Sequence, residues 1–204
     1  MKKLMTIIAT CMLVVSSYAQ SESNPFMDSE KKETAPFQAP AAYLGFSTGM
    51  NNMIGILGPQ LDVVLSEKFT LGAGIGLSTW GSKWALNLKF YPKGWYQFYI
   101  KGGYSQNSGL KDFEVEMELE SGKKENVIMD LKPVGNVFFA GGYAWKLGQR
   151  NKFFIEAGYA VPLLTNDYYE LHDDSVRLSS TSKNVLRLLR PGGLIIAVGF
   201  SFAL

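Results

Sequence analysis

The sequence GGLIIAVGFSFAL runs from Gly192 to Leu204 and predicts a β-strand with two very different faces. Every second side chain from Leu194 onward is large and apolar, whereas the side chains between them are mostly small. A half-buried sheet in water normally carries a polar face opposite its apolar one. A strand between lipid and a crowded barrel interior has instead the pattern seen here. The stretch therefore predicts one wall of a transmembrane β-barrel.

Seven further segments share this alternation, so that the chain from residue 41 onward predicts eight strands. Most of them match the length of about 9–11 residues that a tilted strand needs to cross a bilayer. In the clearest segments one face is apolar and uncharged, and the other carries Gly, Ala and a few charges. We expect an all-β, eight-stranded antiparallel up-and-down transmembrane β-barrel. The predicted strands are 41–50, 54–66, 69–80, 83–91, 95–106, 134–147, 153–163 and 192–204.

The lengths of the connections and the positions of the aromatic residues support the same arrangement. Short turns near 66–68, 92–94 and 148–151 fall at one end of the predicted barrel, and the long connections at about 107–133 and 164–191 fall at the other. Outer-membrane barrels have short periplasmic turns and longer external loops. Outward-facing aromatic residues gather near both ends, where amphipathic rings prefer to lie at a membrane interface.

The N-terminal residues 1–19 have the pattern of a secretory signal peptide. Lys2 and Lys3 precede an apolar run, and Ser17-Tyr18-Ala19 predicts cleavage before Gln20. Residues 20–40 are polar and rich in Ser, Glu, Lys and Pro, which predicts a flexible periplasmic tail. Residues 41–204 would form the barrel, and the expected location is the bacterial outer membrane.

Composition argues against several kinds of chemistry in the mature chain. The single cysteine, Cys11, lies within the signal peptide, so we expect neither a disulfide nor a thiolate. Without Lys2 and Lys3 the chain has 18 basic and 18 acidic residues, a balance that does not favour a nucleic-acid partner. With one histidine and no remaining cysteine, we predict no metal and no cofactor.

Residues 41–204 resemble the small eight-stranded outer-membrane β-barrel proteins of Gram-negative bacteria. The most specific feature is the end of the chain, where Gly199, Phe202 and Leu204 look like the assembly signal of that family, with Leu204 in the place of its usual aromatic residue. The resemblance implies recognition by the barrel-assembly machinery. It also implies one of three roles: surface interaction or adhesion, envelope structure, or lipid acyl transfer. Fold alone does not choose among them.

Several polar residues are predicted to point into the barrel, because they share the face with the small residues. Eight strands leave a lumen that side chains fill, so we expect a structural plug in which the lysines pair with Asp62 and Glu156. A gated ion path is the alternative, and it would need a continuous water channel. The predicted lumen residues are Gln60, Asp62, Asn87, Lys89, Lys101, Lys146 and Glu156.

The connection 107–133 predicts a β-hairpin that rises above the membrane. Phe113, Val115, Met117 and Leu119 alternate with glutamates, and a Ser-Gly turn precedes a return strand at 127–131. A ten-stranded barrel is the alternative. We favour the protruding hairpin because a lumen lined with the glutamates would bury unpaired charge.

Within the connection 164–191, the segment from Ser175 to Arg190 is basic where the hairpin is acidic, because it carries Arg177, Lys183, Arg187 and Arg190 and no acidic residue. Ser182 is predicted to cap a short helix that ends at Pro191-Gly192. The segment either docks on the acidic hairpin or meets phosphate groups of outer-membrane lipid and glycolipid. We favour docking, because the complementary charge lies in the same chain.

These features predict a non-catalytic outer-membrane β-barrel that acts in surface interaction, adhesion or envelope structure through its two long external loops, with a surface partner that the sequence does not name. The residues predicted to make these contacts are Phe113, Val115, Met117, Leu119, Arg177, Lys183, Arg187 and Arg190. One alternative is a lipid-modifying enzyme of the acyltransferase type, which would use His172 with a nearby Asp and Ser175. Another is a narrow passive pore. A soluble lipocalin-like barrel would carry its charges on the outer face, which is the reverse of this pattern.

Overall fold

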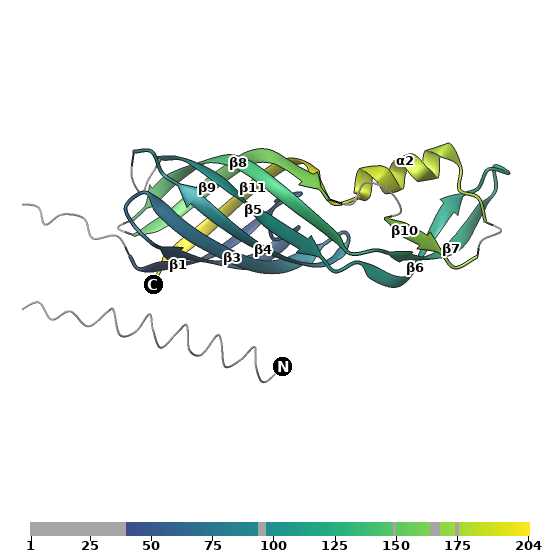
Figure 1. Cartoon of the computed structure of the whole chain (residues 1–204), viewed down its shortest axis with the longest axis horizontal. Coiled ribbons are helices and arrows are strands. Elements are labelled where there is room, and N and C mark those ends of the chain that lie inside the picture. Colours follow the sequence, from purple (N-terminus) through teal and green to yellow (C-terminus); the bar gives the residue numbers. More distant parts are fainter. Residues whose placement is uncertain (1–39, 94–96, 149, 164–167, 174–175) are drawn as a thin grey trace, which may run out of the picture.

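The computed structural model describes residues 40–93, 97–148, 150–163, 168–173 and 176–204. The predicted signal peptide at 1–19 and the predicted tail at 20–40, except Pro40, lie outside these residues. Figure 1 shows a long barrel that carries a smaller group of strands and one helix at one end. No helix in the described part of the chain is both long and apolar enough to cross a membrane.

Eight antiparallel strands form a closed barrel, which confirms the predicted fold class. Neighbouring barrel strands follow one another in chain order, and the last strand closes the barrel by pairing with the first. The observed bounds lie within a few residues of the predicted ones. The barrel strands are β1 (Ala42–Met50), β2 (Leu57–Val64), β3 (Phe69–Ser78), β4 (Gly81–Phe90), β5 (Gln97–Asn107), β8 (Val134–Leu147), β9 (Asn151–Pro162) and β11 (Gly193–Ala203).

The barrel exposes large apolar side chains on its outer face, whereas its inward face carries small, polar and aromatic side chains together with Ile195. In β11, Leu194 and Ile196 are about half exposed, whereas Ile195 and Ala197 between them are buried. Each of the other barrel strands also exposes large apolar side chains. Folding in water would normally bury such residues, so a continuous apolar outer surface on a closed barrel indicates contact with lipid.

Aromatic rings form a band at the barrel end where the short turns and the C-terminus lie, here called the turn end. Successive rings contact one another across three strands at this end, and a separate pair lies toward the opposite end. The contacts at the turn end are Tyr143–Trp145, Trp145–Phe153 and Phe153–Phe200, with ring centroids 4.6, 5.6 and 5.0 Å apart, and the separate pair is Trp84–Tyr104 at 5.6 Å.

The connection between β1 and β2 folds back into the mouth of the barrel. Met53 and Ile54 are completely buried there and pack with inward side chains that include Phe138. The prediction of a strand from residue 54 was therefore wrong at its start, because β2 begins at Leu57. Asn51 and Gly55 explain the difference: both have left-handed backbone conformations, with φ of 49° and 96°, that turn this segment inward.

The two long connections together form a second folded unit, the outer module, which rises from the opposite end of the barrel (Figure 1). Its sheet has the order β10-β7-β6 and is separate from the barrel. The predicted hairpin is thus confirmed, and the ten-stranded alternative is wrong. The elements of the outer module are β6 (Leu110–Glu118), β7 (Lys124–Leu131), β10 (Tyr169–Leu171) and α2 (Ser180–Leu189).

Helix α2 begins one turn earlier than the sequence predicts. Its N-cap is Ser179, whose hydroxyl accepts a hydrogen bond from the Ser182 backbone N–H. Ser182 was therefore the wrong choice of cap. Its hydroxyl instead donates to the Glu118 carbonyl oxygen and accepts from the Glu118 N–H, which fastens the start of α2 to the end of β6.

The outer module has a hydrophobic core of its own, and Trp80 joins this core to the barrel. Trp80 lies in the turn between β3 and β4 and is buried among the module residues, where its indole N–H donates to the Lys132 carbonyl oxygen at 2.9 Å. Such a core of several buried side chains indicates a fixed structure rather than two independent loops. The buried core residues are Trp80, Met117, Val127, Met129, Leu131, Val134, Leu178 and Leu186.

We expect Gly72→Leu to prevent closure of the barrel and Ala73→Leu to be tolerated. A Cβ at Gly72 would lie 2.5 Å from Asp62 Oδ1 and 2.8 Å from Asn87 Oδ1, whereas neighbouring Ala73 points outward and is exposed. Gel migration of boiled and unboiled samples measures closure, because a detergent-resistant barrel migrates faster unboiled. A shifted unboiled band for Gly72→Leu would contradict the inward assignment.

Candidate functional site

Two buried ion pairs cross the barrel interior. Lys89 Nζ lies 2.6 Å from Asp62 Oδ2, and Lys101 forms an ion pair with Glu156. Tyr99 donates from its hydroxyl to Glu156 Oε1 at 2.7 Å, so that both carboxylate oxygens of Glu156 are bonded. Buried charges persist in proteins when they are paired and hydrogen-bonded in this way.

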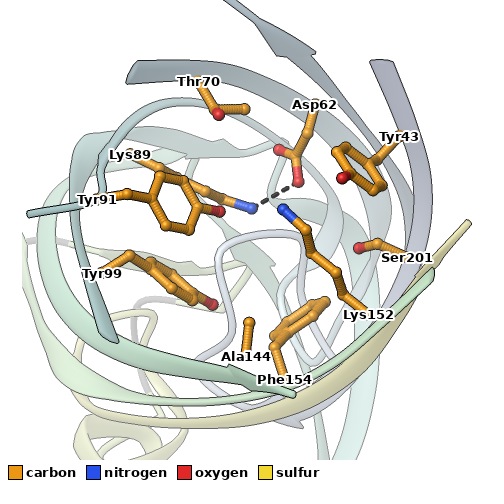
Figure 2. Close-up of a pocket in the computed structure, with 10 residues that line it drawn as sticks. All are labelled: Tyr43, Asp62, Thr70, Lys89, Tyr91, Tyr99, Ala144, Lys152, Phe154 and Ser201. Carbon is orange, nitrogen blue, oxygen red and sulfur yellow. Dashed lines mark hydrogen bonds and ion pairs between the residues drawn. The ribbon is translucent and has the colours of Figure 1, made fainter. Parts of the chain in front are cut away.

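Aromatic rings surround the lysines near the turn end (Figure 2). Lys152 Nζ lies 4.1 Å from the ring centroid of Tyr43 and 5.2 Å from that of Tyr91. Lys89 Nζ is 5.6 Å from the ring centroids of Tyr99 and Phe154. Cation–π attraction therefore adds to the ion pairs in a region where the buried lysines outnumber the buried acids.

The space left between these side chains is very small. The cavity drawn in Figure 2 holds about 10 Å³, which is close to the room that one water molecule needs. Charged and aromatic side chains line it from several strands, and Lys89 and Asp62 are paired across it. This cross-section of the barrel is filled by side chains, which is the arrangement expected of a structural plug.

The predicted lumen residues are placed as expected with one exception. Gln60, Asp62, Asn87, Lys89, Lys101 and Glu156 are all buried inside the barrel. Lys146 was wrongly assigned, because it is exposed at the turn end. By alternation along β8, the side chain of Lys146 belongs to the inward face, but this end of the strand extends beyond the packed interior of the barrel. Two further buried lysines, Lys83 and Lys152, were missed although they share a face with Asn87 and Glu156, respectively.

The apolar residues predicted to make contacts from the hairpin have an internal role instead. Met117 is buried in the core of the outer module, and Phe113, Val115 and Leu119 pack against that core. Their assignment as partner-contacting residues was therefore incorrect, because the module's own core occupies this face of the hairpin. The opposite face carries the exposed Glu114 and Glu116.

The predicted docking of the basic segment on the hairpin involves one end of that segment. Lys183 Nζ lies 3.6 Å from Glu120 Oε1, and the Glu120 N–H donates to the Arg177 carbonyl oxygen. Leu178 also forms an isolated antiparallel bridge with Leu119. Arg187 and Arg190 lie at the other end of α2, where they line a groove beside the barrel.

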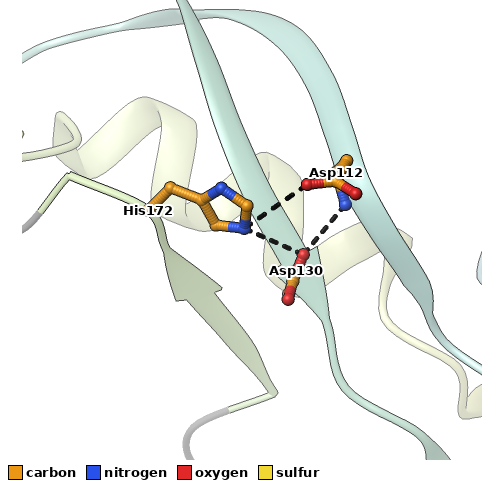
Figure 3. Close-up of side chains that lie close together, drawn as sticks. All are labelled: Asp112, Asp130 and His172. Carbon is orange, nitrogen blue, oxygen red and sulfur yellow. Dashed lines mark hydrogen bonds and ion pairs between the residues drawn. The ribbon is translucent and has the colours of Figure 1, made fainter.

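His172 joins β10 to the hairpin through two aspartates from β6 and β7 (Figure 3). Its Nε2 lies 3.0 Å from Asp130 Oδ1 and 3.9 Å from Asp112 Oδ1, and the Asp112 N–H donates to Asp130 Oδ1 at 2.9 Å. The Asp112 N–H and the His172 ring hold the pKa of the Asp130 carboxyl below its usual range. This contact was missed because the three residues are remote in sequence.

The same three side chains are the described residues with the geometry to hold a metal ion. Asp112, Asp130 and His172 offer ligand atoms that all lie within 4.8 Å of one another. All three are partly or largely exposed, and the contacts of the His172 ring with the two carboxylates already account for their arrangement. Ser175, the predicted nucleophile partner of His172, lies outside the described residues.

The fold and its interior define a closed, side-chain-filled eight-stranded β-barrel with an apolar exterior. No family model and no curated protein matches the chain. Among solved structures, the chain is similar to the crystal structure of CarO2 from Acinetobacter baumannii, with 14% sequence identity and a TM-score of 0.45 over 81% of this chain and 99% of that one.

Glu156→Gln is expected to lower the free energy of unfolding by about 3 kcal/mol, because it leaves the buried Lys101 without its countercharge. Urea unfolding in detergent measures the change. Replacing both partners, as Lys101→Met with Glu156→Leu, should recover most of the loss. The matched control is Glu170→Gln, which removes the exposed pair with Lys132 and should cost less than about 1 kcal/mol. Equal losses for both single variants would contradict a buried pair.

Acid should loosen the contact between β10 and the hairpin. Because the pKa of Asp130 is lowered on folding, its contribution is present above the usual carboxyl pKa of about 4 and is lost as the pH falls through the lowered value. Hydrogen exchange of the His172 amide, which donates to the Ile128 carbonyl oxygen, reports this contact after correction for intrinsic rates. In the variant Asp130→Asn, the protection of the His172 amide should not change over the same pH range, because residue 130 no longer titrates. A wild-type response identical to that of Asp130→Asn would exclude the assignment.

Proposed function

We propose that the protein is a non-catalytic outer-membrane β-barrel that presents its outer module to a partner at the cell surface. The continuous apolar outer surface of the closed barrel supports the membrane location, because a soluble barrel would carry polar residues there. The aromatic contacts at the turn end, from Tyr143 to Phe200, suit a membrane interface. The outer module then projects beyond the bilayer on the side opposite the short turns.

A pore is the less favoured alternative. Two ion pairs and a cluster of aromatic rings fill the lumen, and the inward loop with Met53 and Ile54 covers the mouth at the module end. Eight-stranded barrels have interiors just wide enough for such side chains. The interior therefore favours an anchoring role for the barrel over transport.

An enzyme of the acyltransferase type is also less favoured. His172 bonds to Asp130 through its ring, and no serine in the described part of the chain is hydrogen-bonded to it. General-base catalysis requires a nucleophile within hydrogen-bond reach of the histidine. The geometry supports a role for His172 in holding β10 against the hairpin.

The observation that carries the proposal is the unpaired outer edge of β6. In the described residues no strand pairs with this side of β6 from Leu110 to Met117, and only its end is covered, by the segment around Leu178. The Glu118 N–H and carbonyl face away from β7, so by alternation those of Glu114 and Glu116 do too. Such an edge accepts an extended segment of another chain by strand addition, and the glutamates favour a basic one.

The substitution Glu116→Pro tests strand addition with a matched control, Glu116→Thr. Both variants remove the same charge, but only proline removes the outward N–H, and proline is tolerated on an edge strand. A ten-residue peptide of alternating Lys and Val is the probe, and fluorescence anisotropy with the detergent-solubilised full chain measures its binding. We expect Glu116→Pro to weaken binding at least tenfold relative to Glu116→Thr, because main-chain hydrogen bonds supply much of the affinity in this mode.

Two outcomes would overturn the proposal: no saturable binding by the wild type, or equal affinity for the two variants. Deletion of 112–132 provides a second check. The deleted chain should still give a shifted unboiled band, because the barrel strands do not depend on the hairpin for their pairing, and it should not bind the peptide. Retained binding in the deletion variant would place the site elsewhere.

A further inference from the structure

A groove of about 680 Å³ lies at the junction of the barrel and the outer module. The end of α2 lies beside the module end of the barrel (Figure 1), and Leu188 and Leu189 form one wall. The other wall is formed by Tyr159 from β9, Leu194 from β11, and Ile56 from the end of the β1–β2 connection. All three are more than half exposed, and Tyr159 and Leu194 belong to the outward apolar surface of the barrel. The groove is therefore continuous with the surface that faces lipid.

The charge of this groove is entirely positive. Its lining includes Lys83, Arg187 and Arg190 and contains no acidic residue. Lys83 is buried within the barrel mouth, where its Nζ donates to the Asn52 carbonyl oxygen at 2.8 Å. Arg190 is oriented by Tyr168, because its guanidinium carbon lies 5.3 Å from that ring centroid. A cationic groove that opens on an apolar surface matches a ligand with an anionic head and an apolar tail.

The exposed side chains of α2 indicate the same class of ligand. Leu188 is 84% exposed, and no other large hydrophobic residue described is as exposed. It lies between Arg187 and Leu189, next to the membrane-facing rim. An amphipathic helix with basic residues beside exposed leucines is typical of binding at a lipid interface. Docking on the hairpin occupies the Lys183 end of α2, which leaves the arginine end toward the barrel rim.

We propose that this groove binds the phosphate-bearing headgroup of an outer-leaflet glycolipid, with Arg187 and Arg190 on the phosphate and Leu188 against the acyl chains. The inference rests on the proposed outer-membrane location. Guanidinium groups bind phosphate through paired, charge-assisted hydrogen bonds, and partial exclusion of water by the apolar walls strengthens them. The bound lipid would join the end of α2 to the barrel wall and so hold the outer module at a fixed height above the membrane.

The test uses the full chain in a phosphate-free glucoside detergent and measures lipid binding by native mass spectrometry. The probes are bisphosphorylated lipid A and the same lipid after removal of its phosphates. We expect the wild type to bind the phosphorylated lipid at least about tenfold more tightly, and the double variant Arg187→Gln/Arg190→Gln to lose this preference. The control Lys123→Gln/Lys124→Gln removes the same charge from the hairpin turn and should keep it.

A second variant, Leu188→Asn, keeps the test independent of folding, because Leu188 makes little internal contact. It should weaken binding of both lipids while the band shift of the barrel is unchanged. Equal binding of the two lipids, unchanged preference in the arginine variant, or equal loss in the lysine control would each overturn the inference. Full competition by inorganic phosphate at concentrations near those of the lipid would also overturn it, because a free anion would then be the ligand.

Membrane insertion and lipid preference are measured separately, so the proposed membrane location and the lipid groove can fail independently. Failure of the wild type to insert into lipid vesicles, shown by protease sensitivity of the barrel and the absence of a shifted unboiled band, would overturn the membrane location itself. Insertion without a preference for phosphorylated lipid would overturn only the groove.

Discussion

Closure of the β1–β11 pair is the constraint on which the rest of the structure depends. A strand inside a bilayer has no water to satisfy its backbone, so every N–H and C=O must be paired with a neighbouring strand. The pairing of Tyr43 through Met50 with Ala203 through Ile196 removes the last free edge of the barrel. Once closed, the barrel has a fixed internal width, and this width explains both the glycines of β3 and the exclusion of the hairpin glutamates from the interior.

The period-2 pattern was sufficient to predict the barrel because it depends on local chemistry alone. Each strand shows its lipid-facing side by its own sequence, and the parity of Asp62, Lys89 and Glu156 follows directly. Parity does not show where a strand leaves the packed interior, so Lys146 was placed inside although it is exposed. The inward turn at Asn51 and Gly55 was also missed, because it depends on two backbone conformations and not on hydropathy.

The outer module was harder to predict because its contacts join segments that are far apart in the chain. The alternation of Phe113 with Glu114 predicted a hairpin, but the alternation alone does not show that α2 covers the apolar face. The His172 contact with Asp112 and Asp130 had no sequence signal at all, since the three residues lie in separate elements. Long-range packing of this kind is decided by the geometry of the whole fold.

The origin of the outer module in two separate connections has a consequence for the order of folding. The hairpin is inserted between β5 and β8, whereas β10 and α2 are inserted between β9 and β11, the last strand of the chain. The β10–β7 pairs and the Leu119–Leu178 bridge cannot form until both insertions are side by side. The apolar face of the hairpin therefore stays uncovered until the C-terminal segments that pack against it are in place. Completion of the outer module is thus a late step of assembly, because it requires both insertions and therefore the C-terminal part of the chain.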